Sequence, residues 1–569
     1  MTSADEWNAA CEVERATRLE RFREIALREA EKGGDVAAKG ALERWRPRGR
    51  DGAARGEPVA DADRGVILDV VRRAVAVCGL EDTVALTTEL VRFQTVAAVA
   101  PPDENPEFLA LAVFLERWCN DAGLEFRIHG AHDAYEVVLP GRNDGRALSF
   151  IAHADVAPIG DPPAFVAPGE VPTGWTVPPY EARVVEERLY GRGTEDDKGP
   201  IAAALIVLAT LADAGLVPER DVVLAMGTGE EHDWDGMKRY AEEAPVSDNY
   251  VSIDAEFPVV VAEDGFVEWG LQLPAGEPPA ESARPVALHV NGGLFLTQVP
   301  DSAESWLRPG TEDAEALRAG AERAIAARVA EWGADAGFSG EVEIAEREGT
   351  PAVVIRAHGR SVHSSTPEGG ANALWLLARV AHDLELAPGG IATVLGVLDE
   401  YFVDDLFGEK IGLAYSDPLM GPLIVAPTVL RVENGIVRLE VNMRRPAGRS
   451  PEEFQAGLDA LLGRLRQEFG ESLARLDGAW VGSPSQVDPA SPLVQELLDV
   501  YRAVSGDASA QPVGLRGGTY ARLFPGAVSF GPCLPGEPYR GHGGDETIEL
   551  RALDLTVRAL LEATIRLSF

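Results

Sequence analysis

Positive charge is scarce in this sequence. It contains 52 Lys and Arg residues against 92 Asp and Glu residues, which gives a formal net charge of −40 at pH 7. A surface this acidic is repelled by nucleic-acid backbones and by anionic membranes, so neither is expected as a partner. The net charge does not predict the charge of a substrate, because a local pocket can oppose the field of the whole protein.

Cysteines and long apolar runs are also scarce. The four cysteines are scattered without Cys-x-x-Cys spacing, which excludes a zinc ribbon or a disulfide framework and predicts free thiols. No run of about eighteen apolar residues occurs, so no transmembrane helix is expected. The first residues lack the basic and apolar segments of a signal peptide. Together these absences predict a cytoplasmic protein.

Two motifs of other enzyme classes are missing. Gly191-Arg-Gly193 is not followed by the third glycine of a dinucleotide-binding loop. No Gly-x-Ser-x-Gly elbow marks a serine hydrolase. A nucleotide-dependent enzyme and a serine hydrolase are therefore excluded.

The first part of the chain is predicted to be helical. Apolar residues at helical spacing predict helices over 5–31, 66–78, 82–94 and 107–122. The Arg-, Gly- and Pro-rich segment 45–63 is typical of a linker. Residues 1–64 are accordingly assigned to an N-terminal helix and linker.

Four short apolar runs downstream each lead to a side chain that can bind metal. They are Ala147–Ala152 with His153, Asp221–Met226 with Glu230 and Glu231, Tyr250–Ile253 with Asp254, and Ala527–Phe530 with His542. Apolar strands alternating with helices indicate an α/β domain, with a mostly parallel sheet covered by helices. Ligands gather beyond the carboxyl ends of such strands. The sequence thus predicts a site at one sheet edge.

The block 267–480 has a different character. Alternating strand patterns and amphipathic helices are typical of an α+β domain, and none of the metal-capable strand ends falls here. We therefore predict an inserted second domain that divides the catalytic domain into residues 65–266 and 481–569.

The chemistry of the candidate residues favours two metal ions. A lone histidine is more often structural and a lone aspartate more often a helix cap, but five candidates share one predicted edge. Imidazole and carboxylate ligands suit zinc and similar divalent ions. The assignment is His153 and Asp254 on one ion, Glu231 and His542 on the other, and Asp196 as the bridge.

Two further carboxylates then have roles beside the metals. Asp155, two residues after His153, is predicted to accept a hydrogen bond that fixes the imidazole tautomer. Glu230 is left without a metal to bind. It is predicted to act as the general base that activates water and returns the proton to the leaving nitrogen.

Five ordered motifs resemble one known family. They are His153-Ala-Asp155-Val, Gly191-Arg-Gly-Thr-Glu-Asp-Asp-Lys-Gly-Pro200, Gly229-Glu-Glu231, Asp254-Ala-Glu-Phe-Pro258 and Gly517-Gly-Thr-Tyr-Ala-Arg522. Over about residues 66 to 569 the chain resembles the two-zinc metallopeptidase family that includes acetylornithine deacetylase, succinyl-diaminopimelate desuccinylase and carnosinase. It is most similar to their PepV/Sapep-type dipeptidases. The resemblance implies the same metal assignment and a cis peptide at Asp196-Asp197.

The resemblance also implies that the inserted domain is a lid that binds substrate. His363, in Val362-His363-Ser-Ser-Thr-Pro367, is implied as a donor to the developing oxyanion. Arg444 is implied to hold the substrate's α-carboxylate. Gly518 and Thr519 belong to a substrate-binding signature. Thr297 stands where the family usually has Asn, which puts substrate preference in doubt, and the loop before His542 also departs from the family pattern.

These observations predict a dipeptidase with two Zn²⁺ per subunit, for which Co²⁺ or Mn²⁺ would substitute. Its substrates would be small peptides with a free C-terminal carboxylate. An N-acyl-amino-acid deacylase of the same family and a non-catalytic metal- or peptide-binding protein are the alternatives, although Glu230 argues against the latter. The resemblance to the PepV-type dipeptidases, in which an insert of this size lets a monomer complete its own site, favours a monomer over a homodimer.

Overall fold

The computed structural model describes residues 15–48, 56–160, 162–347 and 349–569. The chain divides into two compact units. Unit 1 comprises Met1–Val261, Val487–Val513 and Thr519–Phe569, and unit 2 comprises Ala262–Gln486 and Gly514–Gly518. Unit 2 is therefore an insertion in unit 1, and the short segment Gly514–Gly518 belongs to it although the sequence placed this segment in the catalytic domain.

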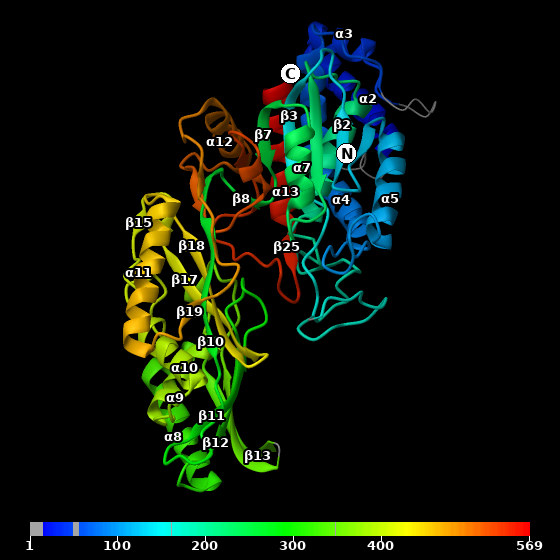
Figure 1. The fold of residues 1–569 in the computed structure, drawn as a ribbon. Coiled ribbons are helices and arrows are strands. Elements are labelled where there is room, and N and C mark those ends of the chain that lie inside the picture. The colour runs from blue at the N-terminus through cyan, green and yellow to red at the C-terminus, as the bar shows by residue number, and fades with distance from the viewer. Residues whose placement is uncertain (1–14, 49–55, 161, 348) are drawn as a thin grey trace. The chain divides into compact units, whose positions relative to one another are not determined.

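The main sheet of unit 1 carries buried parallel strands at its centre (Figure 1). Along the sheet its strands run β1 (Glu125–His129), β2 (Ala134–Leu139), β6 (Asp221–Gly227), β3 (Arg146–His153), β7 (Ser247–Ser252), β23 (Val528–Ser529) and β9 (Val260–Glu263). The β3 strand is parallel to β6 and β7, and β23 is parallel to β7. Every residue of β3 is buried, as expected of a strand covered on both faces.

Helices cover both faces of this sheet. The mutually packed helices α4 (Arg64–Val91), α6 (Lys198–Asp213) and α13 (Leu550–Ser568) lie on one face, with α6 and α13 against β3. On the other face α7 (Asp235–Glu243) and the short helix η4 (Tyr520–Leu523) pack on Ile151 and Val223. The remaining helices are α2 (Arg15–Gly33), α3 (Val36–Arg44), α5 (Pro106–Ala122) and α12 (Pro492–Ser505). This arrangement confirms the predicted fold class.

Short strands outside the main sheet shape the loops of unit 1. They are β4 (Arg183–Val185), β5 (Arg188–Tyr190), β8 (Ala255–Glu256), β24 (Pro532–Cys533) and β25 (Thr547–Glu549). The short strand β22 (Val513–Leu515) pairs with β9 of the main sheet instead. The β25 strand pairs with β5, and β24 pairs with β8. These pairs join the first segment of unit 1 to its last segment beside the main sheet.

The N-terminal part differs from its prediction in two ways. One continuous helix, α4, replaces the two helices predicted at 66–78 and 82–94, because Gly79 is accommodated inside it. The predicted linker is partly fixed, since Gly56 donates to the Ala212 carbonyl and the Trp45 indole donates to the Ala214 carbonyl. Residues 5–14 of the first predicted helix lie outside the described residues.

Unit 2 is an antiparallel sheet with helices on one face. Its strand order is β13 (Ser339–Arg347), β14 (Thr350–His358), β12 (Ser302–Arg308), β11 (Val286–Gly292), β17 (Ile424–Glu433), β18 (Ile436–Arg445), β10 (Gly265–Pro274) and β19 (Ala474–Arg475). Its short strands are β15 (Ser416–Asp417), β16 (Gly421–Pro422), β20 (Trp480–Val481) and β21 (Ser485–Gln486), and its short 3₁₀ helices are η2 (Ala334–Ala336) and η3 (Pro367–Gly369). The helices are α8 (Ala314–Trp332), α9 (Ala373–Asp383), α10 (Gly390–Tyr401) and α11 (Pro451–Phe469).

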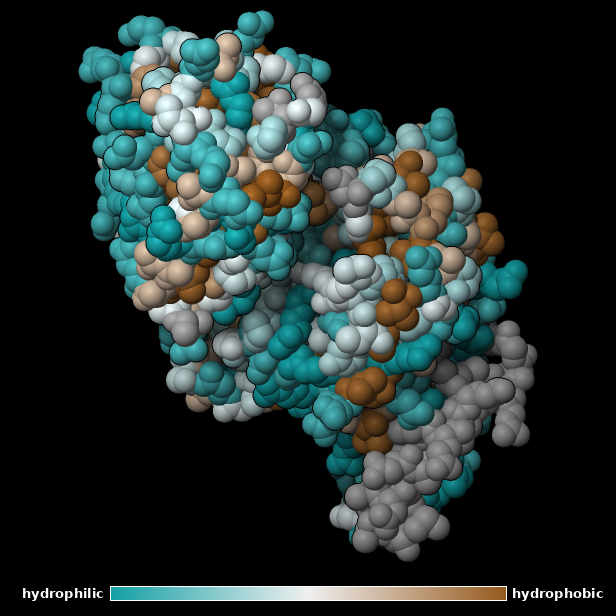
Figure 2. Space-filling view, turned by 90° about the horizontal axis from the view of Figure 1, so that it is seen from below, coloured by the Kyte–Doolittle hydropathy of each residue, from teal (hydrophilic) through white to brown (hydrophobic). Residues whose placement is uncertain are grey.

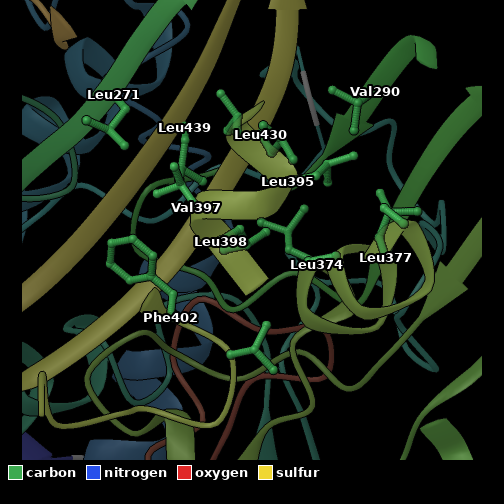
Figure 3. Packing of buried hydrophobic residues seen from close by; sticks show 14 of the residues in the cluster. Leu271, Val290, Leu374, Leu377, Leu395, Val397, Leu398, Phe402, Leu430 and Leu439 are labelled. Atoms are coloured by element: carbon green, nitrogen blue, oxygen red, sulfur yellow. The ribbon is translucent and has the colours of Figure 1, made fainter. Parts of the chain in front are cut away.

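Side chains from this sheet and these helices form one apolar core. In Figure 3, Leu271 and Leu439 of the sheet lie in the same cluster as Leu374 of α9 and Leu398 of α10. The predicted capping box is present at the start of α11, where Ser450 and Glu453 satisfy each other's backbone N–H groups. The helix α10 was not predicted, because its apolar residues are not interleaved with charges.

Cysteines and surface character complete the description. Among the described cysteines, Cys119 and Cys533 are thiols that are not part of a disulfide. Cys78 is disulfide-bonded, so the prediction of free thiols is wrong for this residue, since spacing along the chain does not reveal pairing in space. No helix within the described ranges has the length and apolar character needed to cross a membrane. Hydrophilic residues predominate on the face shown in Figure 2, with apolar ones scattered among them.

Candidate metal centre

The five predicted metal ligands come together at one edge of the unit 1 sheet. His153 is the last residue of β3, Asp254 follows β7, and Glu231 follows β6. Asp196 lies in the turn before α6, and His542 lies in the loop between β24 and β25. Because β3, β6 and β7 are parallel, their carboxyl ends meet and place these side chains in one cluster.

Asp196 stands between two groups of potential ligands. Its Oδ1 lies 2.6 Å from Nε2 of His153, which is 3.7 Å from Oδ2 of Asp254. Its Oδ2 lies 3.2 Å from Nε2 of His542, which is 2.7 Å from Oε1 of Glu231. Within each group the ligand atoms lie within 4.8 Å of one another. One carboxylate thus presents an oxygen to each of two groups.

The electrostatics of the cluster suit bound cations. Burial lowers the pKa of His153, but the charges of Asp196 and Asp254 raise it well above its usual value. Burial likewise opposes the rise in the pKa of His542, which is carried by Glu231 and Asp196. Three carboxylates and two imidazoles converge in the two groups. These residues fit a pair of divalent ions, which would neutralise the carboxylates.

The turn that carries Asp196 is held from behind. The Asp196-Asp197 peptide bond is cis, as the resemblance implies. Asp197 is fully buried and is not a member of either group of potential ligands. Its Oδ2 accepts the backbone N–H of His153 at 3.2 Å. Asp197 therefore joins the turn to the end of β3.

Asp155 has a broader role than predicted. Nδ1 of His153 lies 3.1 Å from the backbone carbonyl oxygen of Asp155 and 3.5 Å from its carboxylate. The carboxylate accepts the backbone N–H groups of Glu230 at 3.1 Å and Glu231 at 3.0 Å. These consecutive donors need an acceptor where β6 ends, so Asp155 holds the Glu230-Glu231 turn as well as facing the imidazole.

Glu230 is set in an environment that favours its protonated form. Burial raises the pKa of its carboxyl well above the usual value, and the charges of Asp254, Glu231 and Asp196 add to the rise, against His153. Its carbonyl accepts the Trp234 indole N–H at 2.6 Å, which further fixes the turn. A carboxylate with a raised pKa is suited to accept a proton from water.

Several residues that surround this centre were not predicted from the sequence. The Tyr539 hydroxyl donates to Oδ2 of Asp196, and its ring meets the His542 ring edge-on. Glu195 is buried, and burial raises its pKa to about 8. Glu546 is buried in an ion pair with Arg192 at 2.7 Å. The only sequence signal for Tyr539 was that its loop departs from the family pattern.

In unit 2 the predicted substrate-binding residues are linked through Ser364. The N–H of Ser364 donates to the Thr297 carbonyl at 2.8 Å. Arg444 lies within hydrogen-bond distance of the Ser364 hydroxyl and the Asn442 side chain, and its guanidinium stands 5.0 Å from the Phe266 ring centroid. His363, the residue before Ser364, accepts the N–H of Ser365 at Nδ1.

Gly518 and Thr519 fall on opposite sides of a unit boundary. Gly518 ends the unit 2 segment, and Thr519 begins the last segment of unit 1. The Thr519 hydroxyl accepts the N–H of Ala521 at 3.1 Å and so caps η4. The structure thus gives Thr519 a local structural contact, and its role in binding substrate stays a prediction.

Comparison with known proteins gives a consistent set of matches. The model of peptidase family M20/M25/M40 matches residues 152–566. The chain is 30% identical over 429 residues to the putative dipeptidase YtjP of Bacillus subtilis (strain 168), covering 73% of this chain and 82% of that one. It is 28% identical over 519 residues to the Beta-Ala-Xaa dipeptidase of Lactobacillus delbrueckii subsp. lactis, covering 90% and 97%.

The fold also resembles a solved structure. Human carnosine dipeptidase 1 superposes with a TM-score of 0.53 at 12% sequence identity, over 88% of this chain and 98% of that chain. At this identity the likeness concerns the fold alone.

Proposed function

The chain belongs to peptidase family M20/M25/M40, as the motifs indicated, and on this premise we propose that it is a metal-dependent dipeptidase. The observation that carries the proposal is the position of Asp196, whose two carboxylate oxygens each face a histidine of a different ligand group. Two relatives named as dipeptidases support the substrate class.

We assign the two metal ions to the ligands that were predicted from the sequence. His153 and Asp254 would hold one ion, Glu231 and His542 the other, and Asp196 both. Nitrogen and oxygen ligands of this kind suit Zn²⁺, with Co²⁺ or Mn²⁺ as substitutes. Divalent ions bound here would supply Lewis-acid activation of water and of the scissile carbonyl.

The chain's own groups then move the protons. Glu230 takes a proton from water onto its carboxylate and passes it to the leaving nitrogen. Asp155 keeps Glu230 in place through the backbone N–H that it accepts. The turn therefore positions the base and the neighbouring ligand Glu231 together.

The residues of unit 2 are proposed to bind the substrate. Nδ1 of His363 lies 2.6 Å from the Ser365 hydroxyl and accepts the Ser365 N–H. With Nδ1 as an acceptor for both groups, the ring proton is proposed to lie on Nε2, which then donates to a carbonyl oxygen as it becomes negative. Arg444 is proposed to bind the α-carboxylate, since a guanidinium matches a carboxylate in shape and charge. Thr297 and Gly518, together with Thr519 of unit 1, are proposed to contact the rest of the peptide. The monomeric state and the cytoplasmic location stay predictions from the sequence.

A substrate panel with controlled metal content tests this function. The protein is stripped with a chelator, reloaded with Zn²⁺, Co²⁺ or Mn²⁺, and assayed on dipeptides, tripeptides and N-acetylated amino acids. We expect hydrolysis of dipeptides only after metal is restored. Full activity of the stripped protein would refute metal dependence, and hydrolysis of N-acetyl amino acids without dipeptides would identify a deacylase instead.

A further inference from the structure

The two histidines of the metal centre are held in different ways. His153 ends a central strand, and its side chain is 1% exposed. His542 lies in a loop with a φ of +64°, and its side chain is 37% exposed. It is flanked by Gly541, Gly543 and Gly544. Glycines leave a backbone wide conformational freedom, and a non-glycine residue at positive φ needs support from its surroundings.

That support comes from the turn that carries the bridging aspartate. Oε2 of Glu195 accepts the backbone N–H groups of Arg540 at 2.5 Å and Gly541 at 2.9 Å. These are the two residues directly before His542. The Cys533 thiol, at the start of the same loop, lies 3.4 Å from Oε1 of Glu195. One side chain therefore contacts both ends of the 533–541 segment.

Contacts also run in the opposite direction. Oε1 of Glu546 accepts the backbone N–H groups of Glu195 at 3.0 Å and Asp196 at 3.1 Å. Arg192 donates to the carbonyls of His542 at 3.4 Å and Gly543 at 3.2 Å. The turn and the loop thus brace each other, and Glu195 provides the contact nearest to the N-terminal side of His542.

We propose that Glu195 is a positioning residue that sets the His542 imidazole at its distance from Asp196 and so controls occupancy of the second metal position. Glu195 directly precedes Asp196 in the chain. One turn therefore fixes both the bridging ligand Asp196 and the loop that carries His542. The role rests on the proposed two-metal function. The positioning role of residue 195 requires a side chain as long as that of glutamate, because one of its oxygen atoms accepts two backbone N–H groups.

Substitutions of Glu195 can separate the effect of side-chain length from the effect of negative charge. Glu195→Gln keeps an oxygen at the same reach without the charge. Glu195→Asp keeps the charge but is shorter by one methylene, and Glu195→Ala removes the acceptor. Positioning predicts that Gln retains the second ion while Asp and Ala lose affinity for it. A purely electrostatic role predicts the reverse order for Gln and Asp.

The test is a Co²⁺ titration of the stripped full-length protein. Native mass spectrometry counts the bound ions, and the visible absorption of Co²⁺ reports their coordination. We expect Glu195→Ala and Glu195→Asp to keep the first ion and to bind the second about 10- to 100-fold more weakly, the usual effect of removing support behind a metal ligand. Glu195→Gln should bind both ions as the wild type does.

Two controls separate positioning from a loss of stability. Glu136→Gln alters another buried glutamate of unit 1. It pairs with Arg146, which begins β3 whereas His153 ends it, and the substitution should leave both ions bound. In a His542→Ala background, which lacks the second imidazole, Glu195→Ala should have no further effect on Co²⁺ binding.

Three results would overturn the inference. They are unchanged binding of the second ion by Glu195→Ala, a loss in Glu195→Gln equal to that in Glu195→Ala, and a further loss in the His542→Ala background. A wild-type protein that binds no pair of ions would instead overturn the proposed function itself and the inference with it.

Discussion

Replacing Asp155 with Asn would disturb the general base and a metal ligand at once. The two carboxylate oxygens accept one N–H each, from Glu230 and Glu231. Asn has nearly the same shape, but it offers one oxygen and one NH₂ group. One of the two backbone N–H groups would then face another donor in a site where the Asp155 side chain is fully buried.

The size of the effect follows from that single lost contact. A hydrogen bond to a charged acceptor contributes about 1.5–3 kcal/mol, so kcat/KM for a dipeptide should fall about 10- to 150-fold. If the NH₂ group faces Glu230, kcat falls at every metal concentration. If it faces Glu231, activity recovers at high metal concentration, because the weakened ligand is again occupied.

The assay measures kcat and KM at a series of free Co²⁺ concentrations, with thermal unfolding of both proteins as the control for folding. Asp155→Asn and the wild type are compared under the same metal buffer. Kinetic constants equal to those of the wild type across the whole series would refute the role that we assign to the Asp155 carboxylate.

Three other substitutions test separate parts of the structure. Glu230→Gln should retain both ions and lower kcat by about 10²- to 10⁴-fold, the usual contribution of a general base; near-normal turnover would contradict its role. Arg444→Ala should raise KM for dipeptides with a free carboxylate but not for their C-terminal amides, and an equal change in both would argue against the clamp. The third substitution is Glu136→Gln. Burial raises the pKa of Glu136, but hydrogen bonds and charges from His129, Tyr240 and Arg146 outweigh burial and lower this pKa from 4.5 to about 2. Its ionised form should therefore stabilise the wild type over Glu136→Gln by about 3 kcal/mol at neutral pH, a difference that fades as the pH falls from 4.5 to 2. Urea unfolding at several pH values measures this difference, and a constant gap would contradict the assignment.

The clustering of the five predicted metal ligands could be predicted because the positions of these residues follow from regular structure. His153, Asp254 and Glu231 lie at or just after the carboxyl ends of apolar strands, and parallel strands bring such ends to one edge of the sheet. The motif match supplied the order of the ligands. Neither argument depends on the detailed path of a loop.

The supporting contacts could not be predicted in the same way. The carboxylate of Asp155 binds backbone groups about 75 residues away, and Glu195 binds a loop still further along the chain. Such contacts depend on loop conformation, which has no periodic pattern in the sequence. The continuity of α4 was missed for a related reason, since the packing around Gly79 outweighs its low helix propensity.

The division of unit 1 into separate chain segments has a consequence for how the protein is made. Four of the five ligands lie before Val261, whereas His542 and the strand β23, which lies between β7 and β9, come from its last segment. A nascent chain leaves the ribosome with its N-terminal part first. During translation the emerging sheet therefore has an open strand edge, and its cluster of carboxylates lacks the second imidazole. The complete set of predicted ligands therefore comes together only after the last segment of unit 1 has been made.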